Sequence, residues 1–307
     1  MLKYRFTTLL IFISRLLIAQ SNTEIFVMDL DFSEENFQVS NFENISKNQD
    51  YDSQPFFIDN EQIVYVRTYD VQTDIVKYHL KEKSLINLSE TTIGGEYSPQ
   101  LIPNTTNYSA VRLDTTGLQR IYKYNAFTKT NILLIKGLQV AYYSFYDKNR
   151  ILSSVLSGNN LDLVFSDLKK RTNDTLLTKV GRSIHRVPNN EFMMSYTAIN
   201  DEKNMDIYQL DINSLESFFV DQLPVGVQDH IWLNESTLLI GSLDKLFLLD
   251  LFGNGDWKLV ADLSKYNIRD ITRLAVNPYG SKIAIVAELK PKVSNKLKKD
   301  PHCLSSK

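Results

Sequence analysis

Histidine, cysteine and acidic side chains are the first candidates for chemistry, because they hold metal ions and move protons. The chain has four histidines, and its single cysteine is Cys303. His79 lies in a short apolar run, and His302 lies close to the C-terminus. His185 and His230 lie in corresponding apolar runs, but their positions within those runs differ by one residue. Successive residues of a strand point to opposite faces, so we expect the two rings not to converge and no metal site to form.

Nucleophilic catalysis has no recognisable motif in this chain. Hydrolases of the α/β type place their serine in a G-x-S-x-G turn, and the sequence contains no such turn. The pair Gly94-Gly95 lacks the lysine and the following helix of a phosphate-binding loop. The stretch FGNGDWKLV at 252–260 has the glycine and tryptophan of a sialidase-type Asp box, but in another order and only once. The sequence therefore predicts no catalytic residue and no cofactor.

Aromatic and basic residues are better candidates, for binding rather than for catalysis. Several tyrosines, histidines and arginines fall at the beginnings of apolar runs that occupy equivalent places along the chain. Side chains of these types contribute strongly to binding when they are desolvated. The alternative is that the tyrosines only pack against neighbouring strands, as aromatic residues in sheets often do. The predicted binding residues are Tyr51, Tyr97, Tyr142, His185, His230 and Arg269.

Six short apolar stretches that resemble one another provide the elements that carry these residues. They read EIFVMDLD, DIVKYHLKE, RIYKYNAFT, DLVFSDLKK, DIYQLDIN and KLFLLDLFG. They begin at positions 24, 74, 120, 162, 206 and 245, so successive copies lie 39–50 residues apart. A repeat of this length is typical of the blades of a β-propeller.

Two further apolar runs precede each complete copy and one follows it. All are short, rich in β-branched or aromatic residues, and bounded by turn-forming residues, which predicts four strands per repeat. The last repeat stops after two strands, ITRLAVNP and SKIAIVAE, and the first begins with the other two, EIFVMDLD and ENFQVSNF. Pairing these halves closes the ring and leaves few open sheet edges. The sequence therefore predicts an all-β, six-bladed propeller with four-stranded blades, closed by a composite blade from both termini.

The first strand of each blade lines the central channel of such a fold, and these strands all enter it at one rim. The predicted binding residues fall at those entries. The opposite rim carries short polar turns, at 59–60, 103–104, 189–190 and 278–279. We therefore expect a partner to bind at the rim where the first strands enter.

The residues of three stretches resemble TolB-type propeller repeats. These stretches are EIFVMDLD, DIYQLDIN and NPYGSKIAIVAE, and the resemblance extends over residues 22–288. Their shared pattern is an isoleucine, an aromatic residue and a hydrophobic–aspartate step in the third strand, after an Asn-Pro-x-Gly type of turn. The resemblance implies a six-bladed propeller fold.

Residues 1–20 differ from the rest of the chain. They begin with Lys3 and Arg5, continue with an apolar run and place Ala19 near a plausible cleavage point, which predicts a secretory signal peptide. A membrane anchor and a buried first helix are the alternatives, although the run is shorter than the about 20 apolar residues that span a bilayer. No later stretch is apolar enough to span a membrane. The propeller is expected to occupy residues 21–288.

The charge is unevenly distributed. The tail at 289–307 carries six lysines and one aspartate, lacks apolar periodicity and is expected to be disordered. The whole chain carries a formal net charge of −2, which leaves −10 for residues 21–288 after the tail and the three basic residues of the leader are set aside. An acidic body is a poor surface for nucleic acid, so no nucleic-acid partner is expected.

These observations predict a periplasmic or secreted bacterial protein, monomeric, that binds a protein or peptide partner in the cell envelope and has no catalytic activity. An enzyme that acts on carbohydrate or peptide at the channel mouth is the alternative. A sensor or accessory domain for a neighbouring membrane protein is a third possibility, since a fold alone does not choose among such functions.

Overall fold

The computed structural model of the chain describes residues 22–33, 36–89, 91 and 93–291. The predicted signal peptide and residues 292–307 of the predicted basic tail lie outside these ranges. None of the helices in the described ranges is long and apolar enough to cross a membrane. Apart from one 3₁₀ turn, η1 (Ser264–Tyr266), the regular elements of the described ranges are strands.

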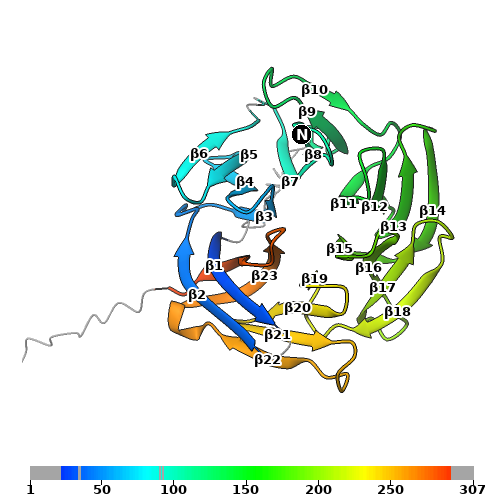
Figure 1. Ribbon diagram of the computed structural model, residues 1–307. Coiled ribbons are helices and arrows are strands. Elements are labelled where there is room, and N and C mark those ends of the chain that lie inside the picture. The colour runs from blue at the N-terminus through cyan, green and yellow to red at the C-terminus, as the bar shows by residue number, and fades with distance from the viewer. Residues whose placement is uncertain (1–21, 34–35, 90, 92, 292–307) are drawn as a thin grey trace, which may run out of the picture.

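The strands of the described residues form six four-stranded antiparallel sheets, arranged as blades around a centre (Figure 1). Five blades are continuous in sequence. From the innermost strand outward they are β3 (Asp52–Phe57), β4 (Gln62–Tyr69), β5 (Gln72–His79) and β6 (Ser84–Asn87); β7 (Gly95–Leu101), β8 (Tyr108–Leu113), β9 (Gln119–Tyr124) and β10 (Asn131–Leu133); β11 (Val140–Phe145), β12 (Arg150–Ser157), β13 (Asn160–Asp167) and β14 (Thr172–Thr178); β15 (Val180–Arg186), β16 (Met193–Ile199), β17 (Met205–Asp211) and β18 (Ser217–Gln222); and β19 (Ile231–Trp232), β20 (Thr237–Ser242), β21 (Lys245–Asp250) and β22 (Lys258–Asp262).

The sixth blade joins the two ends of the described chain. Its strands are β23 (Ile268–Val276), β24 (Lys282–Leu289), β1 (Thr23–Ser33) and β2 (Asn36–Asn44), paired in that order. β1 and β24 are antiparallel and pair without interruption from Thr23 opposite Glu288 to Asp29 opposite Lys282. The predicted six-bladed ring and its composite blade are therefore confirmed.

The six similar stretches of the sequence all become third strands of blades. They fall in β1, β5, β9, β13, β17 and β21. Each of these strands is paired on both sides within its blade. β24 extends to Leu289, and Lys290 Nζ lies 3.0 Å from Asp244 Oδ2 in the turn before β21. The last strand of the composite blade thus ends at Leu289.

The second strands are buried on both faces, because every blade packs between two others. In β4, Ile63, Val64, Tyr65 and Val66 are all fully buried. In a strand with one solvent-exposed face, buried and exposed residues would alternate instead. Ile63 and Tyr65 pack against residues of the composite blade, including Ile25. Burying one such aliphatic side chain stabilises the fold by about 1.5–3 kcal/mol. The core is therefore a ring of interfaces between blades.

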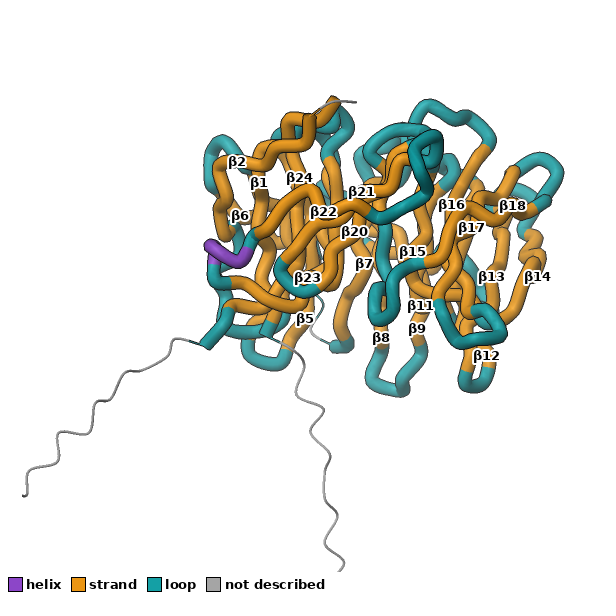
Figure 2. Tube along the Cα trace, turned by 90° about the horizontal axis from the view of Figure 1, so that it is seen from below, coloured by secondary structure: helices purple, strands orange, loops and turns teal. Residues whose placement is uncertain are grey.

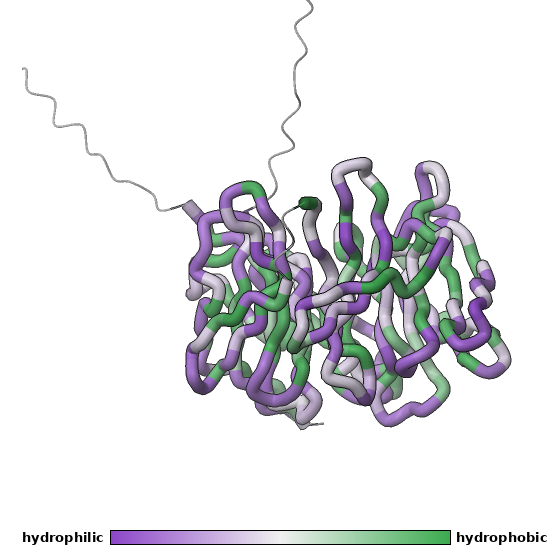
Figure 3. The backbone as a smooth tube through the Cα atoms, turned by 90° about the horizontal axis from the view of Figure 1, so that it is seen from above, coloured by the Kyte–Doolittle hydropathy of each residue, from purple (hydrophilic) through white to green (hydrophobic). Residues whose placement is uncertain are grey.

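The strands run between two rims of turns (Figure 2). Many turns are hydrophilic, and hydrophobic stretches lie along the strands between them (Figure 3). Asparagine takes the left-handed conformation in several of these turns, for instance Asn104 (φ 59°) and Asn189 (φ 55°), where its short side chain tolerates a positive φ. A chain with only 11 glycines can therefore still make tight connections.

Candidate functional site

The innermost strands enclose a central cavity of about 500 Å³. Residues from the inner strands of all six blades line it, and most of them are apolar or aromatic. Pro103, Pro188 and Pro278 also line it, so the cavity reaches the rim of short polar turns that the sequence analysis set aside. A preformed hollow of this size with a few polar groups is typical of a ligand site.

Bulges in the inner strands determine which side chains reach this cavity. Pairing between β15 and β16 is interrupted between Val180 and Ile184, and pairing between β23 and β24 is interrupted between Arg269 and Arg273. A bulge inserts extra residues into one strand and redirects the side chains around it. Arg182 lies within the first bulge and Arg273 ends the second, and both line the cavity.

Gly181 allows the bulge of β15 to lie against its neighbours. A Cβ atom at this position would collide with Thr197 Oγ1, which comes from the adjacent strand β16. The Gly181 carbonyl accepts a hydrogen bond of 2.6 Å from Ser154 Oγ, on β12 of the preceding blade. The backbone that precedes Arg182 is therefore fixed on two sides.

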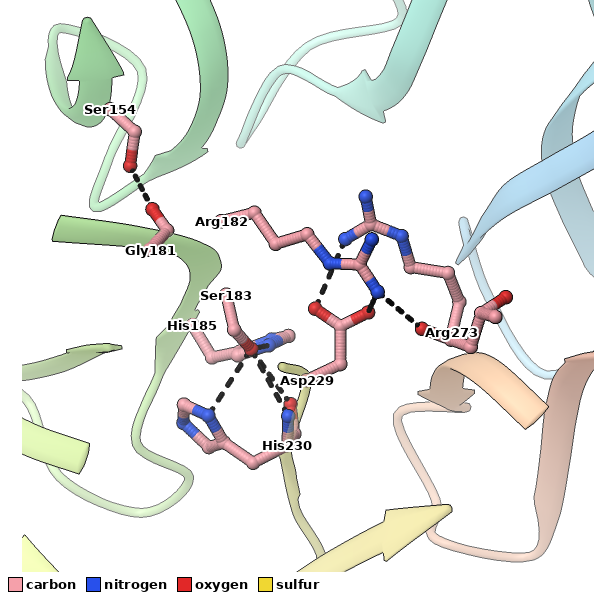
Figure 4. Close-up of polar contacts among 9 residues, drawn as sticks. Ser154, Gly181, Arg182, Ser183, His185, Asp229, His230 and Arg273 are labelled. Atoms are coloured by element: carbon pink, nitrogen blue, oxygen red, sulfur yellow. Dashed lines mark hydrogen bonds and ion pairs between the residues drawn. The ribbon is translucent and has the colours of Figure 1, made fainter. Parts of the chain in front are cut away.

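Two arginines meet on one aspartate in the cavity (Figure 4). Arg182 Nη2 lies 3.0 Å from Asp229 Oδ2, and Arg273 Nη1 lies 3.1 Å from Asp229 Oδ1. Arg182 Nη2 also donates to the Thr272 carbonyl, at 2.9 Å. The side chain of Asp229 is only 8% exposed, and that of Arg273 only 15%. The cluster holds two positive charges and one negative charge in a sheltered position.

Tyrosines surround the guanidinium group of Arg273. Its central carbon lies 5.3 Å from the ring centroid of Tyr142, a cation–π distance. Burial would lower the pKa of Arg273, but Asp229 and then Tyr142 and Tyr51 raise it above its usual value. The arginine is therefore charged at every physiological pH.

The other two predicted tyrosines lie close by without being part of the cavity lining. Burial raises the pKa of Tyr51, and Arg273, Tyr142 and Tyr97 all act on its hydroxyl electrostatically. Tyr97 packs against the hydrophobic cluster between the second and third continuous blades. Tyr97 therefore takes part in the packing between these two blades.

A hydrogen-bond chain runs from the core to the cavity through two serines. The Trp232 indole N–H donates to Ser195 Oγ at 2.8 Å, and Ser195 Oγ lies 2.9 Å from His230 Nε2. Because Ser195 needs an acceptor for its own proton, His230 Nε2 accepts and the ring proton lies on Nδ1, facing Ser183 Oγ at 3.1 Å. Ser183 Oγ also accepts the His230 backbone N–H, and it can donate its own proton to His185 Nε2 at 3.0 Å or to the His230 carbonyl at 3.3 Å.

The expectation that His185 and His230 do not converge is wrong. Their ring centroids are 5.0 Å apart, and both rings contact Ser183 (Figure 4). The two rings converge because the bulge of β15 breaks the regular alternation of side chains along the strand, and because His230 lies just before β19 begins. Burial lowers the pKa of His185 to about 4 and that of His230 well below 6.5, so both rings are neutral at pH 7.

Arg269 lies apart from the cavity lining. Its Nη2 is 2.7 Å from Glu288 Oε2, and its side chain is 48% exposed. The bulge between Arg269 and Arg273 places the second arginine, not the first, beside Asp229. Of the predicted binding residues, the structure therefore brings Tyr142, His185 and His230 into the cavity lining.

Sequence reasoning missed Arg182 and Arg273. The available signal was a charged residue inside an otherwise apolar inner strand, as in ITRLAVNP for Arg273. Charged residues are rarely buried unless they are paired, so such a position calls for a partner.

As for metal binding, the described part of the chain holds no group of three or more His, Cys, Asp or Glu side chains suited to an ion.

Solved structures with the same arrangement include two TolB proteins. A protein assigned as TolB from Agrobacterium tumefaciens superposes with a TM-score of 0.65 at 11% identity, over 87% of this chain and 99% of that one. TolB from Acinetobacter baumannii has a TM-score of 0.58 at 12% identity, over 89% of this chain and 65% of that one. A chain of a nidogen–laminin complex also has a TM-score of 0.58, at 8% identity, over 88% of this chain and 100% of that one.

Sequence comparisons identify no relative of this chain. No protein-family model matches the sequence, and no curated protein matches it. Identities of this size carry information on the fold alone, and the blade count, strand order and superposition agree on it. The chain therefore has the six-bladed β-propeller fold that is found in TolB.

Proposed function

We propose that this protein is an exported, non-catalytic scaffold that binds a protein or peptide partner in the bacterial cell envelope. Part of the partner occupies the central cavity. The observation that carries the proposal is the cluster of Arg182, Asp229 and Arg273 beside Tyr142, because buried arginines and tyrosines are the side chains that dominate binding energy. The likeness to TolB supports the fold that the proposal needs.

Export is supported by the leader. Residues 1–20 combine a basic start with a short apolar run, as signal peptides do. A propeller with a single cysteine needs no disulfide for stability in an oxidising compartment, because its core is large. These two features support a periplasmic or secreted location.

The chemistry of Ser183 argues for binding rather than catalysis. A nucleophilic serine needs an exposed oxygen and a base that takes its proton. Ser183 is 2% exposed, and its oxygen already accepts the backbone and ring N–H groups of His230. Both of its lone pairs are therefore engaged by N–H groups rather than free to attack a substrate carbonyl.

Affinity capture tests the proposal. The chain without residues 1–20 is immobilised and exposed to an envelope extract from the organism that carries the gene, and bound proteins are identified by mass spectrometry. Tyr142→Ala and Arg273→Gln baits are compared with the unaltered bait. The matched control is Tyr69→Ala, which removes a 68% exposed tyrosine at the end of β4, outside the cavity.

The proposal predicts one set of partners that the unaltered and Tyr69→Ala baits retain and the two cavity variants lose. Truncating a binding hot spot costs about 2 kcal/mol or more, which reduces affinity by more than tenfold. Thermal unfolding of all baits is measured in parallel, so that loss of fold is not mistaken for loss of contact. Equal recovery by folded cavity variants contradicts the proposal.

A further inference from the structure

We infer that the group which enters the cavity is a carboxylate carried by the partner peptide, and that Arg273 and Arg182 bind it. This inference rests on the proposed function and narrows it to one chemical class. A C-terminal carboxylate and an Asp or Glu side chain supply the same group, and the experiment below separates these two sources.

The charge of the cavity is opposite to that of the protein around it. Residues 21–288 carry a formal net charge of −10. The charged residues that line the cavity are Arg182, Arg186, Arg273 and Asp229. With neutral histidines their sum is +2, so the cavity is a positive spot inside an acidic body. A hollow with charge of one sign and low-dielectric walls concentrates ligands of the opposite charge.

The arginines retain donors that Asp229 does not use. A guanidinium group carries five N–H donors. Arg273 places one of them on Asp229, and its other contact is with Tyr142. Arg182 uses Nη2 alone for both Asp229 and the Thr272 carbonyl. The remaining donors suit the planar, two-point geometry of a carboxylate, for which arginine is the preferred partner.

Asp229 orients the pair and limits its charge. Two unpaired arginines side by side would repel each other, and Asp229 bridges them at 3.0 and 3.1 Å. The three-residue cluster then carries a single positive charge. One carboxylate brings it to neutrality, which avoids burying an uncompensated charge of either sign.

The surroundings of the cluster match a peptide rather than a free ion. Phe56, Phe145 and Trp232 line the same cavity, together with the aliphatic chains of β23. Apolar walls strengthen the ion pair by excluding water, and they accept the apolar part of a peptide. A ligand with a carboxylate and a short apolar stretch therefore uses both parts of the site.

Isothermal titration calorimetry with synthetic peptides tests the inference. The first pair is acetyl-Ala-Leu-Phe-Ala with a free C-terminal carboxylate and the same peptide as its amide. The second pair is acetyl-Ala-Leu-Glu-Ala amide and its Gln counterpart. We expect one charged peptide to bind at least tenfold more tightly than its neutral counterpart. The pair that shows the difference identifies the source of the carboxylate.

Variants of the protein give expected changes of opposite sign. Arg273→Gln weakens binding of the preferred peptide by tenfold or more. Arg273→Lys weakens it less, because lysine keeps the positive charge but lacks the planar guanidinium group that binds both carboxylate oxygens. Asp229→Asn removes the competing carboxylate and tightens binding by about tenfold, an effect that a purely structural role of Asp229 would not produce. Arg269→Gln makes the same change of charge on the same strand outside the cavity and leaves binding unchanged within about twofold.

Several results would overturn the inference. Equal affinity of charged and neutral peptides is one, and so is the failure of every carboxylate peptide to bind at about 1 mM, which corresponds to only about −4 kcal/mol. Tighter binding of glucuronate than of any peptide would assign the cavity to a sugar acid instead. If partner capture depends on the cavity but these peptides do not compete with it, the proposed function stands and the carboxylate is wrong.

Discussion

Lys282 Nζ lies 2.5 Å from Asp29 Oδ1, although 253 positions separate the two residues in the chain. The contact joins β24 to β1 where the two ends of the propeller meet. Both side chains are partly exposed, so the ion pair itself contributes little, about 0–1 kcal/mol. The stability of the closure therefore depends on the pairing of β1 with β24 and on the apolar residues packed against it.

Truncation of one such residue tests the closure. Ile25 on β1 is fully buried against Ile63 and Tyr65 of the neighbouring blade. We expect Ile25→Ala to lower the free energy of unfolding by about 2–5 kcal/mol, the usual effect of removing a large aliphatic side chain from a core. Ile132→Ala on β10, where the side chain is 55% exposed, is the matched control and should change it by less than about 0.5 kcal/mol. If both variants change the free energy of unfolding in urea equally little, β1 is only loosely packed against the neighbouring blade.

Asp52 should make the protein less stable as the pH rises from about 4 to 7. It is fully buried, Asn48 donates to its Oδ1 at 3.1 Å, and its Oδ2 has no hydrogen-bond partner among the described residues. Burial raises the pKa of Asp52 from 3.8 to about 6. Between these pH values the folded state binds the proton more tightly than the unfolded state, so its stabilising effect is complete below pH 3.8 and is lost as the pH passes 6.

Asp52→Asn removes this titration. Relative to the unaltered protein, the variant should gain up to about 3 kcal/mol between pH 4 and pH 7, since one pKa unit corresponds to about 1.4 kcal/mol. Urea unfolding at unit steps of pH measures the difference. A difference that stays constant over this range contradicts the assignment.

His185 should act in the opposite direction. Burial lowers its pKa from 6.5 to about 4, so the unfolded state binds the proton more tightly between these values. The contribution to stability is therefore complete above pH 6.5 and is lost as the pH falls through 4. His185→Gln should become more stable relative to the unaltered protein by about 2 kcal/mol between pH 7 and pH 4. The same series of unfolding curves checks this, and a change of the opposite sign would exclude a buried neutral ring.

Gly181→Ala should disturb both stability and binding. The added Cβ collides with Thr197 Oγ1 on β16, and overpacking of this kind costs about 1–3 kcal/mol. Because Gly181 precedes Arg182, the shift should also weaken binding of the carboxylate peptide. Ile25→Ala is the comparison, because Ile25 lies on β1 and is not part of the cavity lining. If both variants weaken the fold equally but only Gly181→Ala affects binding, the bulge of β15 positions the arginine.

Most of the architecture could be predicted from the sequence, because every blade is buried between two neighbouring blades and therefore has a similar pattern of apolar residues. Every third strand must be apolar where it meets two neighbouring blades, so EIFVMDLD and DIYQLDIN converge on one pattern. The two half-blades could be predicted from the same repeat, because each end of the chain supplies only two of the four strands of a blade. Such regularities depend on nearby residues and on the strand period of two.

The cavity could not be predicted in the same way. Its composition depends on bulges in β15 and β23, which shift the side chains of Arg182 and Arg273 relative to a regular strand. Bulges leave little trace in one sequence, so Arg269 was preferred to Arg273 and the two histidines were expected to diverge. The meeting of Arg182, Asp229 and Arg273 also joins three blades, which no local pattern contains.

The location of the bound partner is the central claim, and hydrogen–deuterium exchange measures it directly. The protein is labelled with and without the recovered partner, and the exchange of peptides from each strand is compared. We expect protection to concentrate on β15, on residues 229–232 and on β23, which carry the arginine cluster. Protection restricted to the outer strands β6, β10, β18 and β22, with no change at β15 and β23, would contradict it.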